Sequence, residues 1–447
     1  MQQATFWNPP VDDDGHAAVP LAHLNTPAGR LGLPAQSQLE QPLLEVLQTL
    51  GGSAITREVY EAVADRFNLT RAQREAMDPE GKFRIFDREL RWAKQKLDFR
   101  GMVRSPNRGL WELTERGKDY LLTALPGVII PVMHTPNGVV VWGDALAIMG
   151  YVHRGQVQLG LVSPPYPYAE KLYGIWRDER EYLDHFMRFY RAAKDCLTDS
   201  GSMVVNLGLH YEPGHPALSL YQHDFVLRMV REEGWYLAGE HQWVNPAKLP
   251  APAGYVNVER IRCKIANEYV FWFGKTARPK ANNRNVLEPY SEAMLRLLAQ
   301  EQQDRQHRPS GHSIGQLRDN GGSIPTNILT AANTASNSRY RRLCQEAGIE
   351  PHPATFPEDL PEFWVRFTTD PGDLVMDFTA GSLTTGAVTE RLGRRWICME
   401  QNLRYIQGGA FRFDDEVPVT MHPLLHDLYP TDMRTQYRVE RRPLQVA

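Results

Sequence analysis

Apolar residues in the first quarter of the chain recur at helical spacing. Steps of four, three and four residues place one such group on a single helix face: Phe86, Leu90, Ala93 and Leu97. Thr70 and Gln73 have the spacing of a capping box before a further short helix. The stretch MVRSPNRGLWEL is typical of strand, turn and strand, and TERGKDYLL of a capped helix. This order of helices and hairpin predicts a winged-helix domain over residues 39–125.

Strand-like and helix-like runs alternate over residues 126–275. The strands are expected at VVVWGDAL, VQLGLVSPPY, GSMVVNLG and ANEYVFWFGK, and the helices at EYLDHFMRFYRAAKDCL and DFVLRMVREEGWYL. Residues 351–411 return to strand, loop, helix and strand in GDLVMDFTAGSLTTGAVTERLGRRWICMEQN. Such alternation predicts an α/β fold whose doubly wound, mostly parallel sheet carries helices on both faces.

Three segments lack this periodicity. Residues 1–38, rich in Pro, Ala and Gly, are predicted to form a flexible tail or a strap across another domain. Residues 276–350 are polar, dense in Asn, Ser, Arg and Gly, and form an insertion. It is either a surface loop without a role or a target-recognition region built beside a rigid sheet. Residues 412–447 have weak periodicity and are assigned as a C-terminal tail.

The net charge and its distribution limit how the chain could bind nucleic acid. The net charge of −3 over 447 residues argues against a uniformly basic nucleic-acid surface, so that any such site must be a local patch. From Lys82 to Arg108 nine Lys and Arg face three Asp and Glu, a local charge of +6. Either this is a solvated helix face, or the helix and the following turn contact DNA. The DNA-contacting side chains would then be Arg88, Arg91, Lys94, Arg104 and Arg108.

The four cysteines lie far apart and form no CxxC pair, which argues against the usual zinc sites and a disulfide framework. His210, His215 and His223 are scattered, so no metal site is expected. No apolar run approaches about 18 residues, the length that a membrane helix needs. We therefore expect a soluble protein of a reducing cytoplasm.

The stretch LVSPPYPY places a hydroxyl, two prolines and an aromatic ring where a strand ends. Proline has no backbone N–H and a fixed φ, so this segment cannot continue a sheet. Its carbonyls remain as acceptors at fixed angles. Ser163, these carbonyls and Tyr166 would suit the binding of a flat ring that carries an amine. The alternative is a tight proline turn that ends the strand.

A second loop has the features of a nucleoside site. In LVMDFTAGSLTTG a strand ends at Asp377, turns through Ala380–Ser382 and opens a helix near Thr384. The next strand ends in Glu400, nineteen residues after Gly381, where an acid can accept hydrogen bonds from ribose hydroxyls. The single glycine argues against a dinucleotide. An acid at Asp377 suits a cationic group, such as the α-amino end of S-adenosylmethionine.

Together the two loops indicate methyl transfer to an exocyclic amine. The pair resembles the β class of DNA amino-methyltransferases, and SPPY resembles the cytosine-N4 branch of that class. The likeness covers roughly residues 138–408, and it includes GSMVVNLG, HPATFPEDL and the polar run RPSGHSIG…NGGSIPTN…NTASNSRY. Residues 39–120 separately resemble the winged-helix domain at the N-terminus of Mrr-type restriction proteins.

The resemblance implies a role for individual residues. The catalytic set would be Ser163, Pro164, Pro165 and Tyr166; Ser163 Oγ and the Pro164 carbonyl would accept the amine hydrogens, and Tyr166 would stack on the base. The set that binds S-adenosylmethionine would be Asp377, Thr379, Ala380, Gly381, Ser382, Thr384, Thr385, Glu400, Asp144, Phe356 and Pro357. In the insertion, DNA would be contacted by Arg308, Ser310, His312, Asn320 and Arg339. Thr379 and Leu383 depart from the family loop, which has an aromatic residue and a second glycine there.

Of three alternative functions, the sequence argues against one and leaves two open. Methylation at cytosine C5 needs a Pro-Cys pair, and the four cysteines follow Asp, Arg, Leu and Ile. An adenine-N6 enzyme with an unusual serine and an inactive DNA-binding regulator with this fold both remain as alternatives. The expected partner is double-stranded DNA, with a cognate restriction endonuclease as a further candidate, and the expected location is the cytoplasm, at the nucleoid. These motifs fix neither the recognition sequence nor the choice between monomer and dimer.

Overall fold

The structure is a computed structural model of the 447-residue chain. It describes residues 27–124, 127–168, 176, 178–250, 252–299, 319–334, 336–355 and 357–439. Among these residues, no helix is both long enough and apolar enough to cross a membrane.

The N-terminal unit consists of helices around a small antiparallel sheet with the strand order β1-β3-β2. Its elements are α2 (Pro27–Arg30), α3 (Gln36–Thr49), β1 (Ser53–Ile55), α4 (Thr56–Arg66), α5 (Arg71–Glu75), α6 (Ile85–Phe99), β2 (Val103–Arg104), β3 (Leu110–Leu113) and α7 (Glu115–Leu121). Phe86, Leu90, Ala93 and Leu97 of α6 are all buried, as predicted. Thr70 and Gln73 form the predicted capping box of α5. The arrangement is that of a winged helix.

This unit begins before residue 39. Ala28, Leu33 and Ala35 are buried in the same apolar cluster as α3 and α6. The part of the predicted tail that the structure describes, residues 27–38, therefore belongs to the folded unit, because its apolar side chains complete that core. The prediction of a flexible tail for residues 1–26 lies outside the described residues.

The main sheet has the strand order β10-β8-β9-β7-β6-β11-β12-β5-β4-β13-β14. The five strands from β7 to β5 are mutually parallel, and β9 and β4 flank them in antiparallel pairing. The strands are β4 (Ile129–His134), β5 (Gly138–Gly143), β6 (Val157–Val162), β7 (Leu197–Gly208), β8 (Tyr236–Val244), β9 (Asn267–Gly274), β10 (Ile328–Thr330), β11 (Leu374–Asp377), β12 (Arg395–Glu400), β13 (Thr420–Met421) and β14 (Arg438–Val439). The predicted fold class is confirmed.

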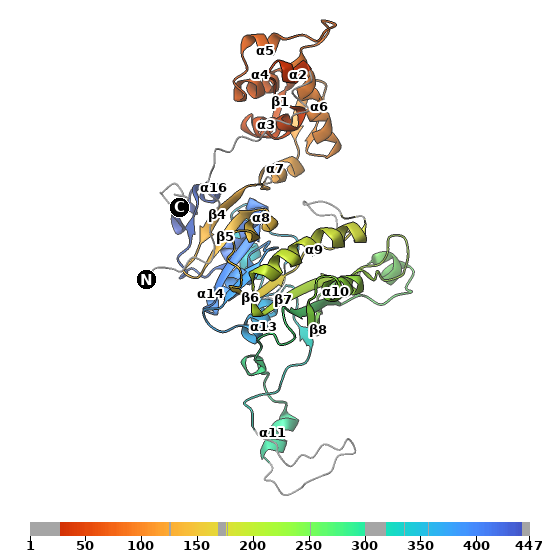
Figure 1. Ribbon diagram of the computed structural model, residues 1–447, viewed down its shortest axis with the longest axis vertical. Coiled ribbons are helices and arrows are strands. Elements are labelled where there is room, and N and C mark those ends of the chain that lie inside the picture. The colour runs from red at the N-terminus through yellow and green to blue at the C-terminus, as the bar shows by residue number, and fades with distance from the viewer. Residues whose placement is uncertain are drawn as a thin grey trace.

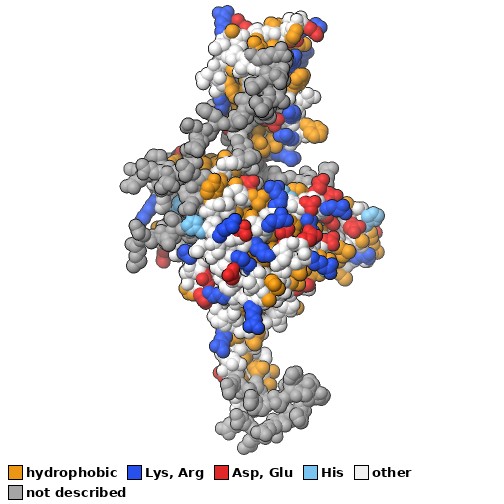
Figure 2. Space-filling model, viewed as in Figure 1, with side chains coloured by type: hydrophobic (Ala, Val, Ile, Leu, Met, Phe, Trp, Pro, Cys, Tyr) orange, Lys and Arg blue, Asp and Glu red, His pale blue; other side chains and the backbone are white. Residues whose placement is uncertain are grey.

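Helices cover both faces of this sheet (Figure 1). One face carries α8 (Ala145–Met149), α9 (Glu179–Cys196) and α10 (Tyr221–Arg231). The other carries α12 (Ser338–Glu346), α13 (Asp359–Thr368), α14 (Thr384–Arg391), α15 (Leu403–Gly409), η3 (Ala410–Arg412) and α16 (Pro423–His426). The remaining helical turns are η1 (Gly254–Val258), η2 (Asn283–Val286), α11 (Glu292–Ala299) and η4 (Arg434–Gln436). Side chains of both charge signs are interspersed over the outer surface of α9 and α10 (Figure 2).

The sheet has its switch point between β6 and β11. These strands are parallel neighbours, yet α9, which follows β6, packs on one face and α14, which follows β11, packs on the other. Divergent connections open a crevice beyond the carboxyl ends of the two strands, which is where ligands bind in open α/β sheets.

Three element assignments differ from the prediction. The predicted helix over DFVLRMVREEGWYL ends at Arg231, and Tyr236 already begins β8, because Gly234 turns the chain at φ 66°. Strand β10 of the polar insertion pairs with β8, while α11 stands away from the sheet (Figure 1). The segment assigned as a C-terminal tail adds β13 and β14 to the sheet edge.

Candidate active site

The two loops predicted from sequence meet at the switch point. Ser163 follows β6 and Thr379 follows β11, and the Ser163 backbone N–H donates to Thr379 Oγ1 at 3.1 Å. Both line one cavity of about 750 Å³. A direct hydrogen bond therefore joins the two loops at the cavity.

Two buried carboxyl groups stand at the ends of neighbouring strands. Asp377 ends β11, and its oxygens accept from the Thr379 backbone N–H at 2.9 Å and from Thr385 Oγ1 at 2.6 Å. Glu400 ends β12 and accepts from the Gly381 backbone N–H at 2.8 Å. Burial raises the pKa of Asp377 to about 6 and that of Glu400 to about 7. Burial disfavours the charged form of each carboxyl group. A ligand that offers a cation or hydroxyl donors would offset this cost by stabilising the carboxylates.

The loop between Asp377 and α14 adopts a left-handed turn at its second family glycine position. Leu383 has φ 61° and a side chain with no exposed surface. A β-carbon at this φ is strained, which is why glycine is favoured there. Arg412 Nε stabilises the turn by donating a hydrogen bond to the Ser382 carbonyl at 2.8 Å. Burial of the leucine side chain accompanies this departure from the loop of the family that the chain resembles.

The SPPY segment lies against the ends of β7 and β9. Tyr166 packs its ring over Gly208, where an added β-carbon would lie 2.3 Å from the ring. Its hydroxyl donates to Glu268 Oε2 at 2.6 Å and accepts from Asn206 Nδ2 at 2.8 Å. Burial first, and the neighbouring Glu268 next, raise the pKa of Tyr166 well above its usual value, so the hydroxyl keeps its proton.

Sequence reasoning missed Asn206, Glu268 and Lys248, which line the cavity with Tyr166. Two signals could have found them. Asn206 is the polar residue inside the otherwise apolar run VVNLG, and it is 1% exposed. Glu268 opens the aromatic strand NEYVFWFG with a charge. Neither signal shows that the two side chains meet, because 62 residues separate them.

Most of the predicted site residues line the cavity. They are Ser163, Pro164, Pro165, Tyr166, Asp377, Thr379, Ala380, Gly381, Ser382, Thr384 and Glu400. Thr385 supports Asp377 from behind, and Asp144 caps α8 by accepting from the Leu146 N–H at 2.8 Å, between the lining residues Gly143 and Ala145. Pro357 is buried but does not line the cavity, and Phe356 is not among the described residues.

The N-terminal unit forms part of the same cavity wall. Its lining residues are Met102, Arg116, Tyr120 and Thr123. The chain after α7 is fixed there by two backbone hydrogen bonds: Ala124 N–H donates to the Gln401 carbonyl and Leu403 N–H to the Leu122 carbonyl, each at 2.8 Å. These bonds hold the residues that directly follow Glu400.

The predicted DNA-contacting residues fall into two groups. In the N-terminal unit, Arg91 and Arg108 are exposed, while Arg104 pairs with Glu112 at 2.5 Å and Lys94 with Asp98; Arg88 lies 3.6 Å from Glu89. In the insertion, Asn320 is exposed, but the Arg339 guanidinium already donates to the Phe411 carbonyl at 2.6 Å and to Asp415 at 2.7 Å. Arg308, Ser310 and His312 lie outside the described residues.

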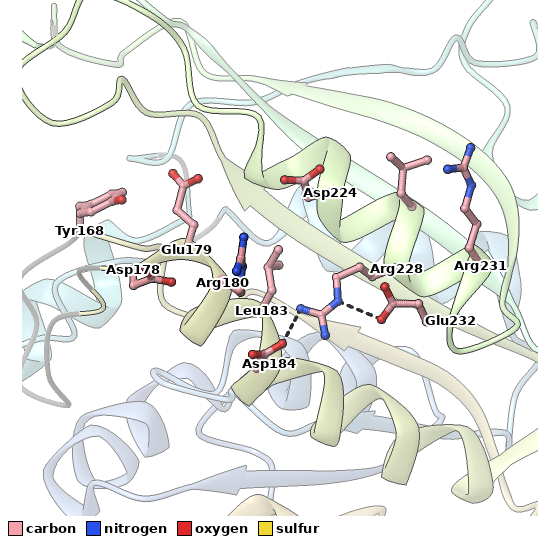
Figure 3. A pocket seen from close by; sticks show the side chains of 11 residues that line it. Tyr168, Asp178, Glu179, Arg180, Leu183, Asp184, Asp224, Arg228, Arg231 and Glu232 are labelled. Carbon is pink, nitrogen blue, oxygen red and sulfur yellow. Dashed lines mark hydrogen bonds and ion pairs between the residues drawn. The ribbon is translucent and has the colours of Figure 1, made fainter.

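A second hollow, of about 840 Å³, lies between α9 and α10 and shares no residue with the first (Figure 3). Its central cation, Arg228, is neutralised by Asp184 at 2.8 Å and Glu232 at 3.1 Å. Within the described parts of the chain, no three metal-ligating side chains come together. All four cysteines are free, and only Cys263 is exposed.

Known proteins resemble this chain over both units. Residues 157–411 match the DNA methylase family, and residues 37–123 match the Mrr N-terminal domain. The Type II methyltransferase M.PvuII of Proteus hauseri is 42% identical over 291 residues, 64% of this chain and 86% of that protein. The solved structure of the PvuII DNA methyltransferase (cytosine-N4-specific) aligns with a TM-score of 0.54 and 33% identity, covering 69% of this chain and 97% of that one. The DNA adenine methyltransferase YhdJ of Escherichia coli (strain K12) is 43% identical over 76 residues, 17% of this chain and 25% of that protein.

Proposed function

Because this chain belongs to the DNA methylase family, we propose that it transfers a methyl group from S-adenosylmethionine to the N4 amine of a cytosine in duplex DNA. The observation that carries the proposal is the hydrogen bond from the Ser163 N–H to Thr379 Oγ1. It joins, at a single switch point, the loop proposed to bind the amine to the loop proposed to bind the nucleoside. The resemblance to a cytosine-N4-specific relative supports the choice of base.

The residues at the ends of β11 and β12 fit S-adenosylmethionine. Its α-ammonium group and ribose hydroxyls are hydrogen-bond donors, and the buried carboxyls of Asp377 and Glu400 are acceptors. Ala380, Gly381 and Ser382 bring backbone close to the ligand between them. When bound, this cofactor supplies a methyl carbon made electrophilic by its positive sulfur.

Ser163 and Pro164 would orient the target nitrogen. The lone pair of a cytosine amine is delocalised into the ring, so the nitrogen attacks poorly while it stays planar. Acceptance of its two hydrogens by Ser163 Oγ and the Pro164 carbonyl favours a tetrahedral nitrogen with its lone pair toward the cofactor loop. Tyr166 stacks on the ring, which contributes on the order of 1–3 kcal/mol. Most of the acceleration then comes from positioning.

A base inside a duplex cannot reach these groups, so the cytosine must flip out, at a cost of roughly a few kcal/mol. Exposed Arg91 and Arg108 of the winged helix and the polar insertion are suited to contact phosphates and base edges during this step. We further infer that the enzyme modifies DNA at a specific sequence alongside a cognate restriction endonuclease, as the Type II name of its relative suggests.

Adenine-N6 methylation is a second candidate, favoured by the 76-residue likeness to an adenine enzyme. One experiment separates the two. Duplex DNA of mixed sequence is incubated with the protein and S-adenosylmethionine, digested to nucleosides and analysed by mass spectrometry. We expect N4-methyldeoxycytidine alone. N6-methyldeoxyadenosine would select the adenine reaction, and no methylated nucleoside from any duplex would favour a regulator that only binds DNA.

A further inference from the structure

Glu268, at the start of β9, lies beside the SPPY segment at the cavity wall. Its Oε2 accepts from the Tyr166 hydroxyl at 2.6 Å and from Asn206 Nδ2 at 2.8 Å. Its Oε1 lies 3.0 Å from Lys248 Nζ. The Glu268 side chain is 12% exposed, and all four residues line the cavity. A carboxylate with so little contact to water has its charge balanced by these three donors.

The carboxylate fixes the direction of the hydrogen bonds around it. A carboxylate carries no hydrogen, so the Tyr166 hydroxyl must give it its only one. The Tyr166 oxygen is then left as an acceptor, 3.5 Å from Ser163 Oγ. The Ser163 hydroxyl hydrogen can point there, which keeps the lone pairs of Ser163 Oγ available for a substrate amine.

Asn206 is oriented by the same group. Its Nδ2 has two hydrogens and two acceptors at 2.8 Å, Tyr166 Oη and Glu268 Oε2, whereas Ser163 Oγ lies further away, at 3.4 Å. Its buried Oδ1 has no hydrogen-bond partner among the described residues. If the Asn206 amide were flipped, Oδ1 would face the Glu268 carboxylate, and two acceptors would meet. The hydrogen bond from Nδ2 to Glu268 therefore leaves Oδ1 buried without a partner in the described part of the chain.

We propose that Glu268 is a positioning residue for methyl transfer, which acts through Tyr166 and Asn206 to keep Ser163 Oγ an acceptor for the target amine. This role rests on the proposed function. Glu268 lies on β9, a strand outside both sequence motifs, so under this proposal β9 sets the direction of the hydrogen bonds at Ser163. Lys248 balances the charge that this polarity requires.

The test is Glu268→Gln in the full chain. Glutamine has nearly the same shape, but its amide carries two hydrogens, which must face Tyr166 or the Lys248 ammonium. We expect kcat to fall about 10- to 100-fold, because the Ser163 hydroxyl loses its fixed direction. The affinity for S-adenosylhomocysteine, measured by calorimetry, should change by less than about twofold, since Asp377 and Glu400 are untouched. Glu240→Gln, an exposed glutamate on the adjacent β8, is the matched control and should keep wild-type kcat.

Coupling distinguishes positioning from simple destabilisation. Tyr166→Phe removes the hydroxyl that links Glu268 to Ser163, so the double variant should be no slower than the slower single variant. If Glu268→Gln does not fold, Tyr166→Phe alone must show the loss of kcat at unchanged cofactor affinity. Wild-type kcat in either folded variant overturns the inference. A wild-type protein that methylates no cytosine overturns the proposed function instead.

Discussion

Gly208, the last residue of β7, supports the ring that is proposed to stack on the target base. A β-carbon at this position would lie 2.3 Å from Tyr166 Cε2 and 2.6 Å from Cδ2. Gly208→Ala therefore tests whether the position of Tyr166 limits the reaction. The substitution adds one methyl group and changes no charge.

The size of the effect follows from the geometry. Ordinary carbon contacts begin at 3.4 Å, so the ring must move by at least 1.1 Å, the difference between 3.4 and 2.3 Å. The ring borders an open cavity, so we expect the overpacking cost to stay within about 1–3 kcal/mol. A shift of that size also lengthens the 2.6 Å bond from Tyr166 to Glu268. Misplacement by about 1 Å can cost about 100-fold in rate, and we expect kcat to fall by this order.

The assay is single-turnover methyl transfer to duplex DNA, together with calorimetric titration of S-adenosylhomocysteine and thermal unfolding. Gly160→Ala on the neighbouring β6 is the matched control. Its β-carbon would meet the flexible end of Met203, 2.5 Å from Cε, rather than an aromatic ring of the site. We expect Gly160→Ala to lower stability by a similar amount while its rate stays near wild type.

The reasoning is refuted if Gly208→Ala transfers methyl groups at the wild-type rate. It is also refuted if Gly160→Ala loses as much rate as Gly208→Ala, because the loss would then report general strain in the sheet. A large loss of cofactor affinity in Gly208→Ala would contradict the assignment of β7 to the base side of the cavity.

Three further predictions concern the cofactor side. The affinity for S-adenosylhomocysteine should fall as the pH drops from 8 through 7 and 6. Glu400 and Asp377, with pKa values of about 7 and 6, become neutral over this range and then bind hydrogen-bond donors less well. A calorimetric affinity that stays constant would contradict the assignment of both carboxyl groups to the cofactor site. Leu383→Gly should lower the free energy of unfolding, measured in urea, by about 1–3 kcal/mol, because loss of a buried leucine outweighs relief of left-handed strain. A variant more stable than wild type would show that the strain outweighs the burial. Tyr120→Ala should weaken binding of S-adenosylhomocysteine by roughly 3- to 10-fold through lost contact area, whereas Lys118→Ala on the same helix should leave the affinity unchanged. Equal affinities of the two variants would show that the N-terminal unit does not contact the cofactor.

Much of the fold could be predicted because it is encoded locally. The spacing of Phe86, Leu90, Ala93 and Leu97 predicted α6 and its buried face. The SPPY and DFTAGSLTT loops were recognisable because each follows a strand and contains residues that end one. Parallel strands present their carboxyl ends at one edge, so Ser163 and Asp377 were expected to share a site.

The sequence alone determined most helices and strands of the two units, the two loops and the family that they resemble, because periodicity and turn chemistry act over a few residues. Only the tertiary structure decided which distant side chains meet. Tyr166 contacts Glu268 across 102 residues, the chain after α7 pairs with residues 401–403, and residues 420–439 supply β13 and β14. Such contacts follow from strand order and register, and these depend on how the whole core packs. No local pattern records that packing, so the contact of the Glu268 carboxylate with Tyr166 became visible only once the sheet was assembled.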